Sequence, residues 1–227
     1  MKPPILICGC PGSGTSLVTK ILRHAGLFTG IDSGPAEARK YHESQCFKRY
    51  NEDFLNRTIA FPHAPKSVDQ FSTHNRLMRE QIETLAESVE RSPLVDEFFG
   101  SPETNVREDV WGWKDPRNSA TAMIWREVFP QLRMIVVDRN WRWRDRWLRR
   151  KSSGTESGNW YRNESTQELR QLYRQPIGMK QVSTLYVDVD QLTTSADFLG
   201  RALTWCGLSA EPASRFDALM DEIGLER

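Results

Sequence analysis

The pattern with the clearest chemistry lies near the N-terminus. A short apolar run from Ile5 to Cys8 meets a glycine-rich turn, and an amphipathic run that starts near Ser13 follows. Glycines let several backbone N–H groups converge on one anion, and the N-terminus of the following helix directs its positive dipole end at the same point. This order predicts a buried strand, a phosphate-binding loop and a helix, with the phosphate held by Gly12, Ser13, Gly14, Thr15 and Ser16.

The loop departs at one position from the loops that bind nucleoside triphosphates. Its spacing from Gly9 to Gly14 fits the Walker A pattern G-x-x-x-x-G-K-[ST], but Thr15 stands where that pattern has lysine. This lysine carries the charge that meets the β- and γ-phosphates. We therefore expect a phosphate ligand other than ATP or GTP. The alternative is a tight glycine turn in an unrelated α/β fold.

The stretch from Gly9 to Leu17 resembles the 5′-phosphosulfate loop of sulfotransferases, which reads roughly G-x-P-[RK]-S-G-T-[ST]-[LW]. Only the cation after Pro11 is missing, because Gly12 stands there. In the family this cation stabilises charge on the bridging oxygen as sulfate leaves. The resemblance thus implies that another cation must reach the loop if the protein is an enzyme.

Two later segments resemble the same family and occur in the expected order. The run Trp113 to Arg117 reads Trp-Lys-Asp-Pro-Arg, and a second run from Phe129 to Val137 follows. They are similar to the family's Lys-Asp-Pro-Arg turn and to its Phe-Pro element with an apolar strand. The run Leu185 to Leu192, with Phe198 to Gly200 beyond it, is similar to the Tyr-Glu-Asp-Leu segment and its helix. Together the matches extend from Ile5 to about Leu208.

The resemblance implies a reaction and a co-substrate. Sulfotransferases move a sulfuryl group from 3′-phosphoadenosine 5′-phosphosulfate to a hydroxyl, here of a small-molecule or glycan acceptor. By analogy with phosphoryl transfer, the protein positions groups and stabilises charge on the leaving phosphate. Three parts are required: a cradle for the 5′-phosphosulfate, a clamp for the 3′-phosphate and a base for the acceptor hydroxyl. No metal is implied, and the sequence has no metal-ligand spacing.

Cationic residues at strand ends are the candidates that complete the cradle and the clamp. Lys114 follows a strand, at the edge where open α/β sheets bind ligands, and we expect it to replace the missing loop cation. Arg117 is a second candidate, and the alternative is that it only pairs with Asp115 across the proline turn. The resemblance places the clamp arginine at the end of the strand Leu132–Val137, where Arg139 is one place off.

A cationic stripe follows Arg139 in the predicted helix Trp141–Lys151. Its arginines are spaced three, four and three residues apart, so they fall on one face of a helix: Arg139, Arg142, Arg146 and Arg149. The stripe would grip an anion, or it is a solvated charged face. The stretch Ser152–Gly158, rich in serine and glycine, is a candidate mobile gate.

The base is a histidine or a glutamate near the acceptor in this family. The run after the first helix and loop reads Tyr-His-Glu-Ser and holds His42 and Glu43. Glu37 competes, and so does His63, which stands between two prolines. We rank Glu43 first, then His42, His63 and Glu37.

The order of elements predicts an α/β fold: a single P-loop-containing domain over residues 1–227, with a central parallel sheet flanked by helices. Strands are expected at Ile5–Cys8, Val110–Trp113, Leu132–Val137 and Val182–Val187. Helices are expected at Thr15–His24, Ala36–Asn56, Leu77–Val89, Ser119–Phe129, Ala196–Cys206 and Pro212–Ile223. The stretch Pro93–Asn105 is predicted to be irregular.

Composition excludes several classes of protein. The net charge is +1, so there is no basic footprint for nucleic acid. No segment approaches the roughly 18 apolar residues of a membrane span, and the four cysteines suit a reducing compartment. We therefore expect a cytoplasmic protein without nucleic-acid or membrane partners, and the oligomeric state is left open.

Two rivals to a sulfotransferase remain at the level of sequence. The first is a small-molecule or nucleotide kinase that uses the loop with ATP, against which Thr15 stands. The second is a relative that binds the nucleotide without turnover, which Gly12 and the displaced Arg139 favour.

Overall fold

Four parallel strands form the centre of the protein. The computed structural model describes residues 2–10, 12–31, 42–60, 68–100, 110–139, 171–173 and 182–224. Within them the strands lie in the order β2-β1-β3-β4. Their bounds are β1 Ile5–Gly9, β2 Gly112–Lys114, β3 Arg133–Asp138 and β4 Thr184–Asp188. The apolar run of β1 is buried along its whole length, as expected for a strand covered on both faces.

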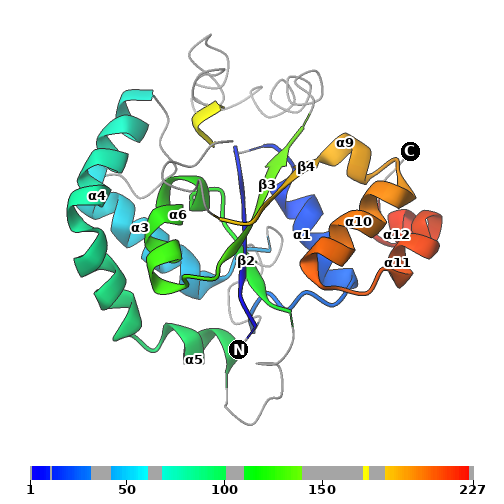
Figure 1. Ribbon diagram of the computed structural model, residues 1–227, viewed down its shortest axis with the longest axis horizontal. Coiled ribbons are helices and arrows are strands. Elements are labelled where there is room, and N and C mark those ends of the chain that lie inside the picture. The colour runs from blue at the N-terminus through cyan, green and yellow to red at the C-terminus, as the bar shows by residue number, and fades with distance from the viewer. Residues whose placement is uncertain are drawn as a thin grey trace.

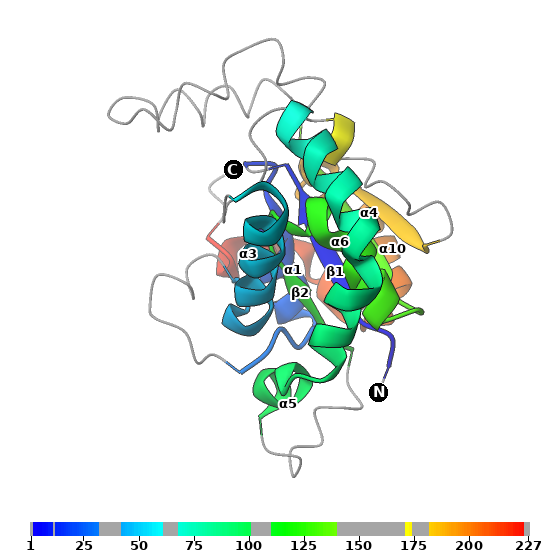
Figure 2. The same cartoon turned by 90° about the vertical axis from the view of Figure 1, so that its left-hand side faces the viewer.

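Helices cover the first face of the sheet (Figure 2), and the core between them and the sheet is rich in aromatic residues. The helices on this side are α3 Gln45–Ile59, α4 Val68–Glu90, α5 Leu94–Phe99 and α6 Asn118–Val128. The ring of Phe47 stacks on Trp113 with centroids 3.9 Å apart, and Trp125 meets Trp113 edge-on at 5.2 Å. These rings belong to one buried cluster with Leu6 and Val136 of the sheet.

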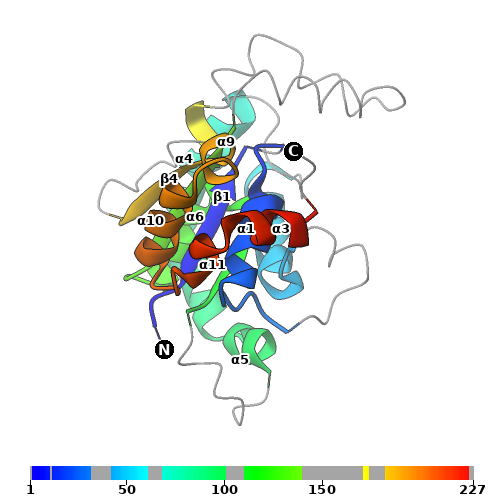
Figure 3. The ribbon, with the colours of Figure 1, turned by 90° about the vertical axis from the view of Figure 1, so that its right-hand side faces the viewer.

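Helices also cover the second face (Figure 3), and the core on this side is mainly aliphatic. Its helices are α1 Thr15–His24, α9 Val189–Leu192, α10 Ala196–Cys206, α11 Glu211–Ser214 and α12 Phe216–Glu222. Ile7 and Ile135 of the sheet pack in one buried cluster with Ile21 of α1 and Leu203 of α10. Figure 1 shows the sheet nearly edge-on between these two layers of helices.

The predicted fold class is confirmed, and most predicted elements are close to their observed bounds. Helices α1 and α10 match the prediction at both ends. Helix α4 begins at Val68 rather than at Leu77. The predicted helix Trp141–Lys151 and the candidate gate Ser152–Gly158 lie outside the described residues.

Three predicted elements were wrong. The helix expected from Ala36 to Asn56 does not include His42, whose φ is +54°, or the extended N-cap Ser44. The stretch expected to be irregular contains α5, which places Phe98 and Phe99 in the aromatic core. The single helix expected from Pro212 to Ile223 is two helices, because Arg215 (φ −114°, ψ 40°) ends α11 and precedes α12.

The order of the strands creates a topological switch point at one end of the sheet. The chain leaves β1 toward β2 on one side and leaves β3 toward β4 on the other, so these connections diverge at the carboxyl ends of β1 and β3. In open α/β sheets ligands bind at such a switch point. The glycine-rich loop follows β1 and therefore lies at this position, at the upper end of the sheet in Figure 1.

Candidate functional site

The glycine-rich loop joins β1 to α1 by a tight turn. The backbone N–H of Ser13 donates to the carbonyl of Cys10 at 2.9 Å. Gly12 (φ 83°) and Gly14 (φ 97°) adopt left-handed backbone conformations that glycine reaches without strain. Gly14 is the N-cap of α1, and the first turn of this helix has no acidic residue. The positive end of the helix dipole is therefore not offset by a carboxylate within that turn.

The loop curls back over the end of β1. A Cβ atom at Gly9 would lie 2.5 Å from the carbonyl oxygen of Val137 and 2.7 Å from Ser13 Oγ, so only glycine fits there. Ser13 is 2% exposed, and its Oγ has no hydrogen-bond partner within the described parts of the chain. A buried hydroxyl without a partner costs free energy, and an anion in the loop would supply the missing acceptor.

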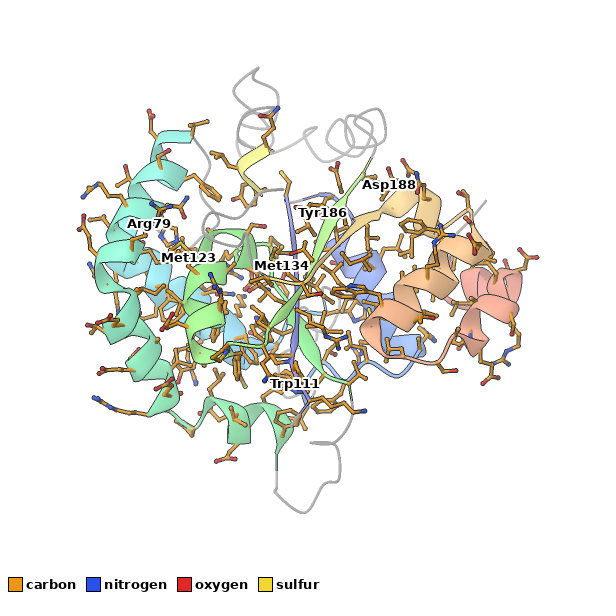
Figure 4. The ribbon with its side chains drawn as sticks, viewed as in Figure 1. Arg79, Trp111, Met123, Met134, Tyr186 and Asp188 are labelled. Atoms are coloured by element: carbon orange, nitrogen blue, oxygen red, sulfur yellow. The ribbon has the colours of Figure 1, made fainter. Side chains whose placement is uncertain are left out.

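Helix α9 packs against the loop. A Cβ atom at Gly14 would come within 2.9 Å of Val189 Cγ2, which begins α9. Asp188 fixes the start of this helix, because its carboxylate accepts hydrogen bonds from the backbone N–H groups of Asp190 and Gln191. Figure 4 shows Asp188 beside α9 at the upper end of the sheet, opposite to Trp111 at the lower end.

Lys114, the last residue of β2, is held by Glu43. It lies beside Ile7 of β1 and is 1% exposed. Its Nζ donates to Glu43 Oε1 at 3.0 Å, and Glu43 also forms a parallel bridge with Lys114 that extends the sheet beyond β2. Burial lowers the pKa of the Lys114 ammonium, and the carboxylate of Glu43 opposes this shift. Two residues that the sequence predicted separately thus form one ion pair.

Arg117 is surrounded by three carboxylates. Its Nε donates to Asp115 Oδ1 at 2.8 Å and its Nη1 to Glu52 Oε1 at 2.6 Å, while Nη2 lies 3.8 Å from Glu43 Oε2. Burial alone would lower the pKa of the guanidinium, but these carboxylates outweigh it and raise the pKa. The contact offered as the alternative, a pair between Arg117 and Asp115, is present, and Glu52 is a partner that sequence reasoning missed.

Arg139 directly follows β3 on the other side of the loop. Val137, two residues earlier, pairs with Gly9 of β1, so Arg139 extends past the point where the loop begins. Its Nε lies 3.5 Å from Asp190 Oδ1 of α9. The loop, Arg139 and the start of α9 therefore lie at one edge.

The remaining base candidates are placed differently. His42 is turned toward α1, where its Nδ1 accepts a hydrogen bond from Arg23 Nη1 at 3.0 Å. This bond requires an unprotonated Nδ1. Glu37 and His63 lie outside the described residues, and so do three members of the cationic stripe, Arg142, Arg146 and Arg149.

The candidate site thus consists of groups at the carboxyl ends of three neighbouring strands. The loop Gly12–Ser16 follows β1, the pair of Lys114 and Glu43 lies at the end of β2, and Arg139 follows β3. The described residues include no cluster of three or more side chains suited to a metal ion. Within the same ranges, no helix is long and apolar enough to cross a membrane.

Comparisons with known proteins identify a family. A model described as the sulfotransferase family matches residues 3–202. No curated protein matches. Among solved structures, a sulfotransferase domain from the curacin biosynthetic pathway is 14% identical, with a TM-score of 0.49, and covers 100% of this chain and 79% of its own. A sugar kinase from Janibacter sp. HTCC2649 is also 14% identical, with a TM-score of 0.39, over 93% of this chain and 98% of its own.

Proposed function

Because the chain belongs to the sulfotransferase family, we propose that it transfers a sulfuryl group from 3′-phosphoadenosine 5′-phosphosulfate to a hydroxyl of a small-molecule or glycan acceptor. The observation that carries this proposal is the loop after β1. Three glycines, an unopposed helix N-terminus and the buried hydroxyl of Ser13 converge there. Such a loop suits a phosphate ester, which accepts from N–H and O–H donors.

The donor's 5′-phosphosulfate would lie in the cradle formed by Gly12, Ser13, Gly14, Thr15 and Ser16. Thr15 at the position of the Walker lysine argues against a nucleoside triphosphate, because no loop cation meets its β- and γ-phosphates. This residue weighs against the kinase alternative, in which the loop would hold ATP.

Lys114 and Glu43 would act on opposite partners of the transfer. Glu43 takes the proton from the acceptor hydroxyl while the acceptor oxygen bonds to sulfur. The bond between sulfur and the bridging phosphate oxygen breaks, and 3′,5′-adenosine diphosphate leaves with the electron pair. Lys114 stabilises the charge that develops on this leaving group. The 3.0 Å contact between the two side chains keeps base and cation adjacent, and His42 is the second candidate for the base.

Arg139 is the proposed clamp for the 3′-phosphate. It follows the strand beside the loop, and its guanidinium can donate two parallel hydrogen bonds to a phosphate. Arg117 is a weaker candidate for a donor contact, because its guanidinium already meets Asp115 and Glu52.

We further propose that residues 1–227 form one domain and that the protein works in the cytoplasm. The support for one domain is that the last helices pack in the same core as β1 and β3. The support for a reducing compartment is that all four cysteines are thiols, and burial raises the pKa of the Cys8 thiol to about 12, which makes it inert.

Thermal unfolding with different nucleotides tests the proposal. We expect 3′,5′-adenosine diphosphate to raise the Tm without Mg²⁺, and saturation at one hundred times its Kd corresponds to about 2.7 kcal/mol. Stabilisation by ATP that depends on Mg²⁺ would favour the kinase instead. Donor binding without turnover over a broad acceptor panel would favour a non-catalytic relative.

The matched control is Arg139→Ala with two ligands. This variant should weaken binding of 3′,5′-adenosine diphosphate far more than binding of 5′-AMP, since only the first has a 3′-phosphate. Equal losses for both ligands would contradict the role of Arg139 as a clamp while leaving the loop proposal intact.

A further inference from the structure

Asn51 is a polar residue in the middle of a buried helical face. It lies in α3, between Phe47 one turn before and Phe54 about one turn after, and it is 0% exposed. Both phenylalanines belong to the aromatic core on the first face of the sheet. An amide at such a position is costly unless its hydrogen-bonding groups are satisfied.

The Asn51 amide makes four hydrogen bonds, which is its full capacity. Its Nδ2 donates to Asp115 Oδ2 at 3.1 Å and to Asn118 Oδ1 at 2.9 Å. Its Oδ1 accepts from Thr121 Oγ1 at 2.6 Å and from Trp125 Nε1 at 2.8 Å. The two sides of the amide therefore contact different groups. The donor side meets Asp115 of the turn after β2 and Asn118 at the start of α6, and the acceptor side meets Thr121 and Trp125 further along α6.

Through its donor side, Asn51 is linked to two of the three strands of the candidate site, β2 and β1. Asp115 Oδ1 accepts from the backbone N–H and the Nε of Arg117, each at 2.8 Å. Asn118 Nδ2 donates to the carbonyl of Ile7 in β1 at 3.0 Å. One amide on α3 thus links the turn that carries Lys114 and Arg117 to the strand that enters the phosphate loop.

Helix α3 and the residue just before its N-cap provide carboxylate partners for those cations. Glu43 lies just before the N-cap of α3 and pairs with Lys114, and Glu52 directly follows Asn51 and pairs with Arg117. A shift of α3 against the turn would therefore move Glu43 relative to Lys114. The Asn51 bonds are buried contacts of fixed direction between α3 and this turn, and they oppose such a shift.

We propose that Asn51 is a positioning residue, which holds the turn of residues 114–118 against α3 and so sets the alignment of Lys114 with Glu43. This inference rests on the proposed function, in which that pair supplies the cation and the base. A buried network whose members are all satisfied specifies one arrangement, whereas an apolar residue of similar size would only fill space.

The test compares two variants on opposite sides of the amide. Asn51→Asp keeps the acceptor side but removes both donors and places a carboxylate against Asp115. Thr121→Val removes a bond to the acceptor side, together with the 3.3 Å contact of this hydroxyl with the Arg117 carbonyl, and leaves the donors in place. Both variants should lower the urea midpoint, because each breaks a buried hydrogen bond. Only Asn51→Asp should lower kcat, by about 100-fold, as expected for a misplacement near 1 Å.

A double variant that exchanges the side chains of residues 51 and 115 separates a positioning role from a general loss of stability. In Asn51→Asp with Asp115→Asn, the amide and the carboxylate trade places, so that the new amide can donate to residue 51 and its oxygen can still accept from Arg117. We expect this double variant to recover a large part of the lost kcat, with little change in donor Kd in any variant. A kcat that falls with the urea midpoint in both single variants, without recovery in the exchange, would overturn the proposal.

A readout that does not need activity keeps the two proposals distinguishable. The Arg117 backbone N–H is bonded to Asp115 Oδ1 outside the helical ladder. Its hydrogen exchange should accelerate in Asn51→Asp, remain unchanged in Thr121→Val and slow again in the exchange variant. If the parent transfers no sulfuryl group but this pattern holds, the proposed function is wrong and the positioning of the turn stands. Equal exchange rates in all four proteins would refute the positioning role whatever the activity.

Discussion

At the scale of single residues, the backbone conformation at Gly12 disfavours the cation that the resemblance predicts at this position of the loop. The resemblance predicts lysine or arginine at this position, yet Gly12 has a φ of 83°. A residue with a Cβ atom costs roughly 1–2 kcal/mol more in such a left-handed conformation. A lysine placed there would therefore strain the turn, so Gly12→Lys is a poor route to restore the cation. In the proposed function the charge comes instead from the neighbouring strand, which ends at Lys114.

Lys114→Met tests whether Lys114 replaces the cation that is missing from the loop. We expect kcat to fall by about 10²- to 10³-fold, the loss seen when one electrostatic donor is removed from a transition state. The variant also removes the 3.0 Å contact of Glu43 with Lys114 and keeps the longer 3.8 Å contact with Arg117, so the fold should weaken. The control for stability is Lys114→Met with Glu43→Gln, which removes the charge that Lys114 had balanced and should regain stability. Its kcat should stay low, because it also lacks the proposed base. Full activity in the folded single variant would show that another cation serves the loop.

Glu43→Gln tests the base separately from the ion pair. The amide oxygen can still accept from Lys114 Nζ, so the fold and donor binding should persist. We expect turnover to fall by roughly 10²- to 10⁴-fold, the usual contribution of a general base. Steady-state kinetics with a measured donor Kd is the assay. If the variant turns over like the parent, the role passes to His42, and His42→Gln becomes the informative variant.

At the scale of elements, the sequence predicted the strand, loop and helix at the N-terminus because several signals coincide there. The apolar run, the glycines and the change of hydrophobic period agree on β1 and α1. The segment around Glu43 lacked such agreement. The predicted helix continues the apolar spacing of α3 upstream to Ala36, although Ser44 is a typical N-cap residue and marks where the helix begins. The contact of Glu43 with Lys114 depends on this break.

The network around Asn51 could be found only in part from the sequence. Residues 47, 51, 54 and 58 recur at helical spacing, so a polar residue stands where the pattern calls for an apolar one. That signal indicates a buried polar group, but it does not identify Asp115 and Asn118 as partners, since they come from a distant element. The same limit applies to Glu52 and Arg117.

His74 joins three helices and makes their packing sensitive to pH. It is 0% exposed in α4, its Nε2 donates to the carbonyl of Ala120 in α6 at 3.0 Å, and its Nδ1 contacts the Thr58 hydroxyl of α3. Burial lowers its pKa from 6.5 to about 4, and the bond to Ala120 opposes this shift only in part. The folded protein therefore keeps this imidazole neutral where the unfolded chain would protonate it.

Stability should fall on acidification for this reason. Between pH 6.5 and about 4 the unfolded state binds the His74 proton and the folded state does not, so the free energy of unfolding decreases as the pH falls. The contribution of His74 to this loss is about 3 kcal/mol over the whole window. Urea unfolding at several pH values should show a steeper loss in the parent than in His74→Gln, which keeps a donor for Ala120. Parallel curves for the two proteins would contradict this assignment.

At the scale of the whole molecule, the sheet is shared by two cores of different composition. Alternate residues of β1 point to opposite faces, so Leu6 lies in the aromatic core and Ile7 in the aliphatic core. The helices after β4 complete the aliphatic core that α1 begins (Figure 1). Neither core can lose its packing without exposing one face of β1 and β3, which argues for a single cooperative unit.

Two core variants test this unity. Ile124→Ala in α6 damages the aromatic core and Leu203→Ala in α10 damages the aliphatic core, and both parent side chains are 0% exposed. Each should cost about 2–5 kcal/mol of unfolding free energy. Trp111, Trp113 and Trp125 lie in the aromatic core, whereas Trp205 packs against the aliphatic core. Both variants are therefore made in a Trp205→Phe background, where the tryptophans of the described cores report on the aromatic face and far-UV circular dichroism reports on the whole chain. If the domain is one unit, Leu203→Ala must shift the fluorescence and dichroism midpoints together. A fluorescence midpoint that stays at the parent value while dichroism becomes biphasic would divide the chain into two separately folding parts.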